Sequence, residues 1–281
     1  MRNFTFKGLF LTAVFILLGC LSIQATDDDL ITRQITIKLD EAGTLPDRIG
    51  ASKKYLITNL KIIGEINGTD LRMIREMAGS DYRGDKTDGN LSVLDLSEAK
   101  IIEGGDYYYY YNDYYYTSND VIGACAFDGC SGLTSLTLPA GITSIGNYAF
   151  WRCRGLTSLT LPAGITSIGS RTFYQCSGLT SIYVYAEKVP KIYSSTFSEC
   201  DTKKCTVYVP MGNHDDYRLS YFGYFENIVE FDPTGIDKTT TSTDVEEVSR
   251  YSVNGQRLVG PTKGLNIVKY SDGSVKKVAV E

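Results

Sequence analysis

A run of near-identical segments, each 23 residues long, constrains this chain more than any other feature. The run lies between Ile122 and Cys200, with copies beginning at Cys130, Cys153 and Cys176. Other apolar residues keep fixed distances from these cysteines, at Phe127, Phe150 and Phe173 and at Leu133, Leu156 and Leu179. Self-similarity at a period of about 20–50 residues is typical of solenoids, in which each unit buries its apolar face only against its neighbours. The chain is therefore predicted to form a stack of similar coils.

Within one unit, the spacing of apolar residues predicts a strand, a turn and a return. The pattern Leu-x-x-Leu-x-Leu ends with Leu136 and Leu138, which point the same way from a short strand. Pro139 ends that strand because it cannot donate to a ladder. Ile142 and Ile145 then return on the other side of the coil. Stacked coils place strand beside strand at about 4.8 Å, so the strands are predicted to form a parallel sheet.

The repeated pattern LxxLxLPxxIxxIGxxAFxxC resembles the leucine-rich repeat of BspA-like (Treponema-type) surface proteins. The segments Asn67-Gly-Thr-Asp70, Met73-Ile-Arg-Glu-Met-Ala78 and Leu94-Asp-Leu-Ser-Glu98 are similar to the opening region of BspA-like proteins from Bacteroides-type bacteria. The resemblance implies a leucine-rich repeat solenoid, a strand-dominated α/β fold with a parallel sheet on one face and a small C-terminal β tail.

The N-terminus has the features of an export leader. Two basic residues precede the apolar run Leu9–Leu18, which is too short for a transmembrane span and fits the core of a signal peptide. Two cleavage sites stay open. A cut after Ala25 would remove a signal peptide of residues 1–25, whereas a lipobox would remove residues 1–19 and leave Cys20 lipidated. Both alternatives predict an exported protein, at the cell surface or outer membrane, or secreted.

Composition divides the rest of the chain into three parts. Residues 28–231 are predicted to be the repeat domain with N- and C-terminal caps. Residues 232–249 are rich in Thr, Ser, Asp and Glu and predict a flexible linker. Residues 250–281 predict a small β tail with hairpin turns at Asn254-Gly255 and Asp272-Gly273. This tail resembles a truncated sorting domain of the type IX secretion system.

A low-complexity insert at residues 106–120 interrupts the repeats. It has no helical period and no alternation, so it is predicted to form a loop on one flank of the solenoid. Exposed tyrosine offers large, rigid contact area at low entropic cost, which makes the insert a candidate partner-binding site. The alternative is a tolerated repeat expansion with partly buried rings. The tyrosines concerned are Tyr107, Tyr108, Tyr109, Tyr110, Tyr111, Tyr114, Tyr115 and Tyr116.

The open face of the predicted sheet is a second candidate surface. Its outward strand positions carry mostly serine and threonine, and solenoids usually bind partners along an extended concave surface. The candidate residues of this face are Thr137, Thr160 and Tyr183. The alternative is that the hydroxyl groups only keep an exposed sheet soluble. On the turn side, Trp151 and Tyr174 share a repeat position and predict an aromatic strip or partial packing.

Residues suited to metal binding or catalysis are sparse. The cysteines that share one repeat position are predicted to form a buried ladder, with a Cys200–Cys205 disulfide as an alternative. The chain lacks a Cys-x-x-Cys pair, and His214 is its one histidine, so neither a zinc site nor a catalytic triad is predicted. The chain is therefore expected to be non-enzymatic, with no catalytic residue, metal or cofactor.

The net charge of the chain and its resemblance to BspA-like proteins together limit the classes of partner that it can bind. A net charge of −5 at pH 7 argues against nucleic acid, and membrane attachment is expected only through a lipid anchor. The resemblance implies a cell-surface or secreted protein that adheres to host matrix or bacterial surface proteins. The alternative is a structural or accessory component of a surface assembly such as a glycan-capture system. Arg83-Gly84-Asp85 matches a tripeptide that integrins recognise, although such short matches often arise by chance.

Overall fold

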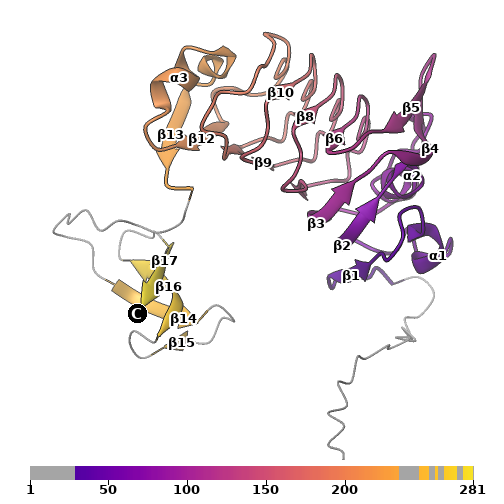
Figure 1. Cartoon of the computed structure of the whole chain (residues 1–281), viewed down its shortest axis with the longest axis horizontal. Helices are drawn as coiled ribbons and strands as arrows, with labels where there is room; N and C mark the ends of the chain where they lie inside the picture. Colours follow the sequence, from indigo (N-terminus) through magenta and orange to yellow (C-terminus); the bar gives the residue numbers. More distant parts are fainter. Residues whose placement is uncertain (1–28, 234–246, 253–256, 259–262, 271–274, 281) are drawn as a thin grey trace, which may run out of the picture.

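The computed structural model describes residues 29–233, 247–252, 257–258, 263–270 and 275–280 (Figure 1). The predicted signal peptide of residues 1–25, its alternative of residues 1–19, and Cys20 lie outside the described residues. Among the described helices, none is both long and apolar enough to cross a membrane.

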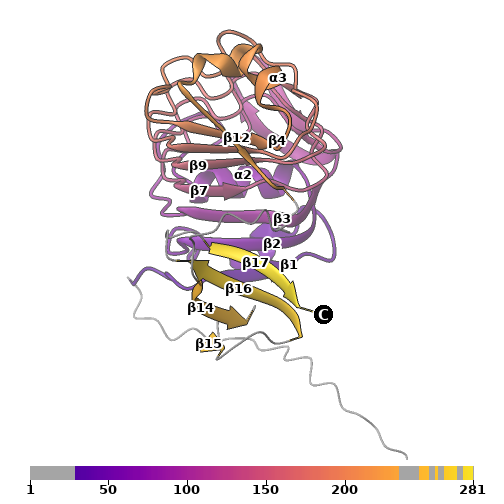
Figure 2. The same ribbon diagram turned by 90° about the vertical axis from the view of Figure 1, so that its left-hand side faces the viewer.

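A parallel sheet of eight strands forms one face of the stack, as predicted. Strands that are far apart in the sequence lie one above another in this sheet (Figure 2). In spatial order they are β1 (Ile35–Lys38), β2 (Asn59–Ile66), β3 (Val93–Ile101), β7 (Ser135–Thr137), β9 (Ser158–Leu161), β11 (Ser181–Val184), β12 (Thr206–Pro210) and β13 (Asn227–Phe231). The return segments form a second parallel sheet of β6 (Val121–Ile122), β8 (Ser144–Ile145) and β10 (Ser167–Ile168).

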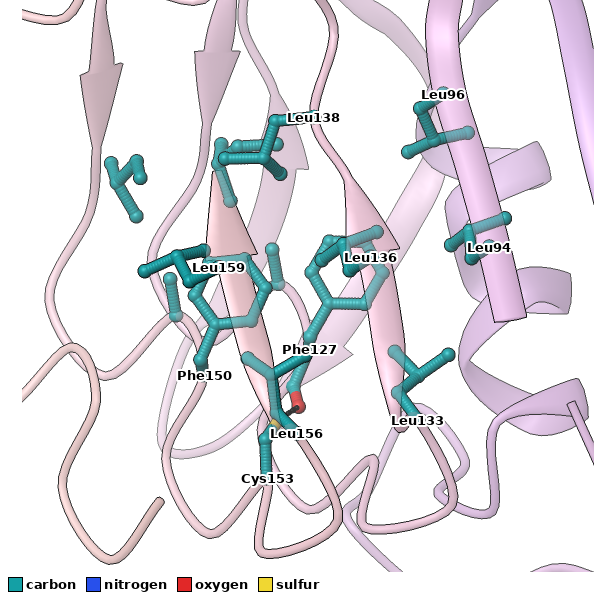
Figure 3. Close-up of a cluster of buried hydrophobic side chains, with 14 of the residues drawn as sticks. Leu94, Leu96, Phe127, Leu133, Leu136, Leu138, Phe150, Cys153, Leu156 and Leu159 are labelled. Atoms are coloured by element: carbon teal, nitrogen blue, oxygen red, sulfur yellow. Dashed lines mark hydrogen bonds between the residues drawn. The ribbon is translucent and has the colours of Figure 1, made fainter. Parts of the chain in front are cut away.

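The core repeats in register with the sequence. Leu136 pairs with Leu159 in the sheet, which is a step of one repeat. The rings of Phe127 and Phe150 stack with centroids 5.2 Å apart and planes 4° from parallel (Figure 3). Phe173 stacks on Phe150 with the same distance and angle. Phe197 extends this stack at 5.1 Å, although one residue is inserted before it. Each coil therefore contributes one buried ring to a continuous column.

The predicted cysteine ladder is confirmed. The thiol of Cys153 donates to the carbonyl oxygen of Phe127 at 3.1 Å (Figure 3). Cys176 and Cys200 repeat this contact one and two coils further on, at 3.1 and 3.0 Å. Cys200 and Cys205 are free thiols, so the alternative disulfide does not form. The thiols thus act as small core side chains that also satisfy the carbonyl oxygens of the phenylalanine column.

The N-terminal cap contains helices α1 (Leu45–Ile49) and α2 (Gly68–Met77). Asn67 caps α2, and the Asp70 carboxylate accepts from the backbone N–H of Asn67 at 2.9 Å in a capping box. The same buried carboxylate accepts from the backbone N–H of Leu45 at 2.9 Å. One aspartate therefore caps its own helix and fixes the start of the neighbouring helix.

The tyrosine insert is a β-hairpin, so the predicted loop is wrong. Its strands are β4 (Gly104–Tyr110) and β5 (Tyr114–Thr117), which pair antiparallel beside α2 (Figure 1). The register shifts between Gly104 and Tyr109. A bulge changes which face successive side chains occupy, so the strand carries no simple alternation in its sequence.

The C-terminal cap closes the other end of the column. It consists of α3 (His214–Arg218) and the 3₁₀ turn η1 (Tyr221–Tyr224), followed by β13. Phe222 and Phe225 pack against Phe197, with ring centroids 5.6 and 5.2 Å away. These two rings take the place that the next repeat would occupy, so the last coil is not left open.

The tail forms an antiparallel sheet in the order β15-β14-β16-β17. Its strands are β14 (Glu247–Ser252), β15 (Arg257–Leu258), β16 (Gly264–Tyr270) and β17 (Val275–Val280). The predicted turns at 254–255 and 272–273 lie outside the described residues. The predicted linker of residues 232–249 extends too far, because β14 already begins at Glu247, where it pairs with Tyr270 of β16.

The buried thiols make stability sensitive to alkaline pH. Burial raises the pKa of Cys130 to about 11 and that of Cys205 to about 12, from an ordinary value of 9.0. The unfolded chain therefore releases protons that the folded chain retains. We expect the free energy of unfolding to be level up to about pH 8 and to fall as pH rises from 9 to 12.

Guanidinium unfolding at a series of pH values between neutral and alkaline measures this dependence. Alkylation of the native chain at mildly alkaline pH serves as the control, since the buried ladder thiols are expected to stay unmodified until the chain is unfolded. Rapid alkylation of Cys130, or unfolding free energy that rises across the alkaline range, would contradict the buried-ladder account.

Candidate functional site

The hairpin divides its eight tyrosines between core and solvent. Tyr108 and Tyr109 are buried, while Tyr107 and Tyr115 are half-buried. The other four keep between 41% and 64% of their surface exposed, and these are Tyr110, Tyr111, Tyr114 and Tyr116. The insert therefore combines the two alternatives drawn from the sequence. Some of its rings are buried, and others are exposed and available to a partner.

The two buried tyrosines anchor the hairpin to the first regular coil. The Tyr108 hydroxyl donates to the carbonyl oxygen of Ala124 at 2.8 Å. The Tyr109 hydroxyl donates to the carboxylate of Asp128. Burial raises the pKa of both phenols well above the ordinary tyrosine value, so both remain neutral donors. Tyr108 and Tyr109 are structural anchors, and they are removed from the set of predicted contact residues.

Arg75 of α2 joins the cap, the hairpin and the repeats. Its side chain is fully buried, and its guanidinium lies 4.5 Å from the centre of the Tyr109 ring. The guanidinium donates to five oxygen atoms at 2.9–3.2 Å: the carbonyls of Asp81, Cys125, Ala126 and Asp128 and the hydroxyl of Ser80. A planar, always charged fork suits such a set of carbonyl acceptors. Sequence reasoning missed this residue because four of its five acceptors are backbone atoms, three of them 50 to 53 positions away.

The exposed rings of the hairpin hold one another in place. Tyr107 lies between Tyr114 and Tyr82, with ring centroids 4.7 and 5.6 Å away. The Arg72 guanidinium covers Tyr82 at 4.0 Å and Tyr107 at 5.1 Å. Tyr110 and Tyr114 lie 4.9 Å apart across the two strands. Such mutual packing limits ring motion, so a ligand that binds here loses little side-chain entropy.

A cavity of about 650 Å³ lies between the hairpin and the turns of the repeats. The hairpin contributes three tyrosines, and the loop between α2 and β3 contributes Arg83 and Gly84. The repeats contribute Cys125, Asp128, Gly129, Tyr148, Trp151, Arg152 and Arg171. The cavity thus combines aromatic walls with three guanidinium groups, and the predicted aromatic position of Trp151 lies in it. Trp151 contacts Tyr174 edge to face at 6.1 Å.

The repeat residues of the cavity stand at the turn positions where the copies differ. Cys130–Gly146 and Cys153–Gly169 are identical apart from Ser131 and Arg154. In contrast, the six residues that follow Gly146 and the six that follow Gly169 share only their phenylalanine. Four of the seven repeat residues of the cavity come from these two segments, and the other three come from the corresponding segment of the preceding coil, residues 124–129. Comparison of the copies with one another was the signal in the sequence that would have located this site.

The sheet face brings its predicted residues together in one row. Thr137 pairs with Thr160, and Thr160 pairs with Tyr183. The row continues to Tyr208, whose ring stacks on that of Tyr183 at 4.5 Å. This row lies on the strands, whereas the cavity is lined from the turns and the hairpin, so the two groups of predicted residues do not form one site. Sequence reasoning missed Tyr208.

The part of the chain that the structure describes contains no cluster of three or more histidine, cysteine, aspartate or glutamate side chains that could hold a metal ion.

The loop between α2 and β3 is closed by a carboxylate. The Asp81 carboxylate accepts from the backbone N–H groups of Arg83 and Asp85 at 2.8 and 2.9 Å. The Arg83-Gly84-Asp85 tripeptide is exposed in the turn that these bonds close.

The family comparison matches this region of the chain. The model of the BspA type leucine-rich repeat region finds six copies across residues 110–221. Residues 110–221 are a BspA-type leucine-rich repeat region. The resemblance to BspA-like leucine-rich repeat proteins and the solenoid fold, both inferred from the sequence, are thereby confirmed. BspA-type and other leucine-rich repeat domains generally mediate protein–protein interaction and are generally non-enzymatic. A search of curated proteins found no match to the chain.

The buried guanidinium offers a direct test of how the site is assembled. Replacement Arg75→Met keeps the length of the side chain but leaves its carbonyl acceptors without donors, so we expect a loss of about 3–5 kcal/mol in the free energy of unfolding. Limited proteolysis is expected to cut within β4 and β5 first. The matched control is Arg48→Met at an exposed position of α1, with a change within about 0.5 kcal/mol. Equal stability of the two variants would show that Arg75 does not hold the hairpin.

Proposed function

We propose that the chain is an exported, non-enzymatic cell-surface or secreted protein that adheres to host or bacterial proteins through its turn side. The observation that carries the proposal is the coincidence of three features at one place: the exposed tyrosines, the cavity and the variable positions of the repeats. A scaffold position can repeat unchanged, whereas a contact position must fit a partner that has no such repeat.

The properties of the tyrosines support a contact role. A phenol ring presents apolar area and a hydroxyl at the cost of ordering only two side-chain torsions. Here Tyr110 and Tyr114 already constrain each other, and the hairpin beneath them is anchored by Tyr108 and Tyr109. A partner therefore meets a surface that is ordered before binding, which favours affinity.

The sheet face is better explained as scaffold. Ser135 and Ser158 pair in register, as do Thr137 and Thr160, so the same two side chains recur in successive strands. Just before these strands, the Thr134 and Thr157 hydroxyls each donate to a backbone carbonyl of the preceding coil, at 3.0 Å. The regular coils therefore present nearly the same side chains on this face, and Tyr183 and Tyr208 are the residues of the row that depart from the repeat.

Export is the part of the proposal that rests on the leader. The apolar run and its flanking basic residues support secretion, with either a cut after Ala25 or lipidation of Cys20. A mass spectrum of the mature N-terminus distinguishes the two, because a diacylated cysteine adds the mass of its acyl chains and a cut after Ala25 leaves an unmodified threonine.

Replacement of the exposed tyrosines tests adhesion. The variant Tyr110→Ser/Tyr111→Ser/Tyr114→Ser/Tyr116→Ser is expected to lose at least about tenfold in affinity for immobilised extracellular-matrix proteins, since aromatic anchors dominate most interfaces. Its thermal unfolding is expected to change little, because the buried anchors of the hairpin remain.

The matched control is Tyr221→Ser/Tyr224→Ser, which removes two tyrosines of 46% and 59% exposure from the C-terminal cap. This control is expected to bind as the unmodified chain does. Equal loss in both variants would indicate non-specific aromatic adhesion, and no loss in either would remove the hairpin from the binding surface.

A further inference from the structure

We propose that the cavity between the hairpin and the repeat turns binds an acidic side chain of the partner protein, with its carboxylate against Arg83, Arg152 and Arg171. The proposal rests on the proposed function, because it takes the partner to be a protein. It goes further by assigning a ligand class to a cavity that sequence reasoning did not locate.

The charge balance of the cavity is the first argument. The chain as a whole carries −5 at pH 7, yet three arginines and one aspartate line this cavity. Arg83, Arg152 and Arg171 form no salt bridge with a carboxylate in the part of the chain that the structure describes. Three guanidinium groups without an ion-pair partner in an acidic protein form a local positive site, which attracts an anion and disfavours a cation.

The one carboxylate of the cavity is already engaged. Asp128 is 8% exposed, and its carboxylate accepts from the Tyr109 hydroxyl, while the charges of Arg75 and Arg152 lie near it. Burial nevertheless raises the pKa of Asp128, which weakens its hold on a negative charge. Asp128 therefore belongs to the wall of the cavity and does not neutralise the arginines at its rim.

Two of the three guanidinium groups lie over aromatic rings. Arg152 lies over the Trp151 ring at 4.6 Å, and Arg83 lies over the Tyr82 ring at 5.2 Å. A guanidinium that stacks by its face keeps its N–H edge free for a carboxylate, which it can bind through two parallel hydrogen bonds. The apolar part of an acidic side chain and its neighbours would then lie against Tyr111, Tyr115 and Tyr148. The volume suits a short segment of a partner.

The backbone at these positions is unfavourable for the residues that occupy it. Tyr148, Arg152 and Arg171 have φ values of 60°, 61° and 51°, a region that bulky residues rarely adopt. The position of Arg152 is occupied by Gly129 in the preceding coil, where the left-handed conformation costs least. The same conformation recurs at Gln175 and Glu199, so it belongs to the turn of each coil, and around the cavity this turn carries large charged and aromatic side chains.

Trp151 supplies a built-in reporter, because it is the one tryptophan of the chain and it lines the cavity. Quenching of its fluorescence by iodide and by caesium measures the local charge without any partner. After normalisation to a free tryptophan derivative and to neutral acrylamide, we expect iodide to quench at least twofold better than caesium. The variant Arg152→Asn/Arg171→Asn is expected to abolish this difference, since asparagine tolerates the left-handed backbone while removing both charges.

The matched control is Arg48→Asn/Arg154→Asn, which removes the same charge at exposed positions outside the cavity, one of them only two residues from Arg152. It is expected to keep the iodide preference. Circular dichroism and thermal unfolding of both variants establish that they fold. Equal quenching by iodide and caesium in the unmodified chain, or an iodide preference that survives Arg152→Asn/Arg171→Asn, would overturn the proposal.

Peptide binding then tests the ligand class by the same fluorescence. The probes are a peptide of four glutamates around one phenylalanine, its glutamine counterpart and a tetramer of galacturonic acid. We expect the glutamate peptide to bind at least tenfold more tightly than the other two, and to lose that advantage in Arg152→Asn/Arg171→Asn. Equal binding of the two peptides would overturn the carboxylate assignment, and tighter binding of the saccharide would overturn the protein partner.

These results separate this inference from adhesion itself. If the tyrosine variant loses matrix binding while Arg152→Asn/Arg171→Asn retains it, the adhesive function holds and the carboxylate site fails. If the unmodified chain binds no matrix protein, the quenching and peptide measurements still decide the charge preference of the cavity.

Discussion

The stacking of one coil on the next, at a step of 23 residues through the regular repeats, is the constraint on which the rest of this structure depends. Because each coil returns to the same place, any position in the repeat becomes a row along the molecule. Two of the rows that face inward are a column of phenylalanine rings and a column of cysteine thiols. Hydrogen bonds from the thiols to phenylalanine carbonyl oxygens join the two columns. The rows at the turns do not have to pack in this core. They are where the copies differ, and they are where the cavity lies.

The buried guanidinium of Arg75 joins the hairpin to one end of the regular stack, so the two ends of the stack differ. Arg75 donates to carbonyl groups of the first coil and lies against Tyr109, so the N-terminal cap, the hairpin and the repeats share one charged centre. Burial of a guanidinium is costly unless its donors are satisfied, and here most of them are. The consequence is a rigid hairpin that stands beside the turns at one end of the stack and forms one wall of the cavity.

The sequence predicts what depends on periodicity and misses what depends on distant partners. Leu136, Leu138 and the cysteine ladder follow from spacing alone, because strands and columns recur with the repeat. The hairpin does not, since its tyrosine run has no alternation and its anchors are the Ala124 carbonyl and the Asp128 carboxylate. The site residues divide the same way. Thr137 and Thr160 are located correctly on the sheet, whereas the periodicity gives no reason to group Arg152 and Arg171 with the hairpin tyrosines that line the same cavity.

The central claim is that a partner contacts the turn side and not the sheet. Hydroxyl-radical footprinting of the chain, alone and with a matrix protein that it binds, tests this directly, because tyrosines report on both faces. We expect the partner to reduce oxidation of Tyr111, Tyr114 and Trp151 and to leave oxidation of Tyr183 and Tyr208 unchanged. Protection of Tyr183 and Tyr208, with Tyr111 and Trp151 unchanged, would contradict it and return the binding surface to the sheet.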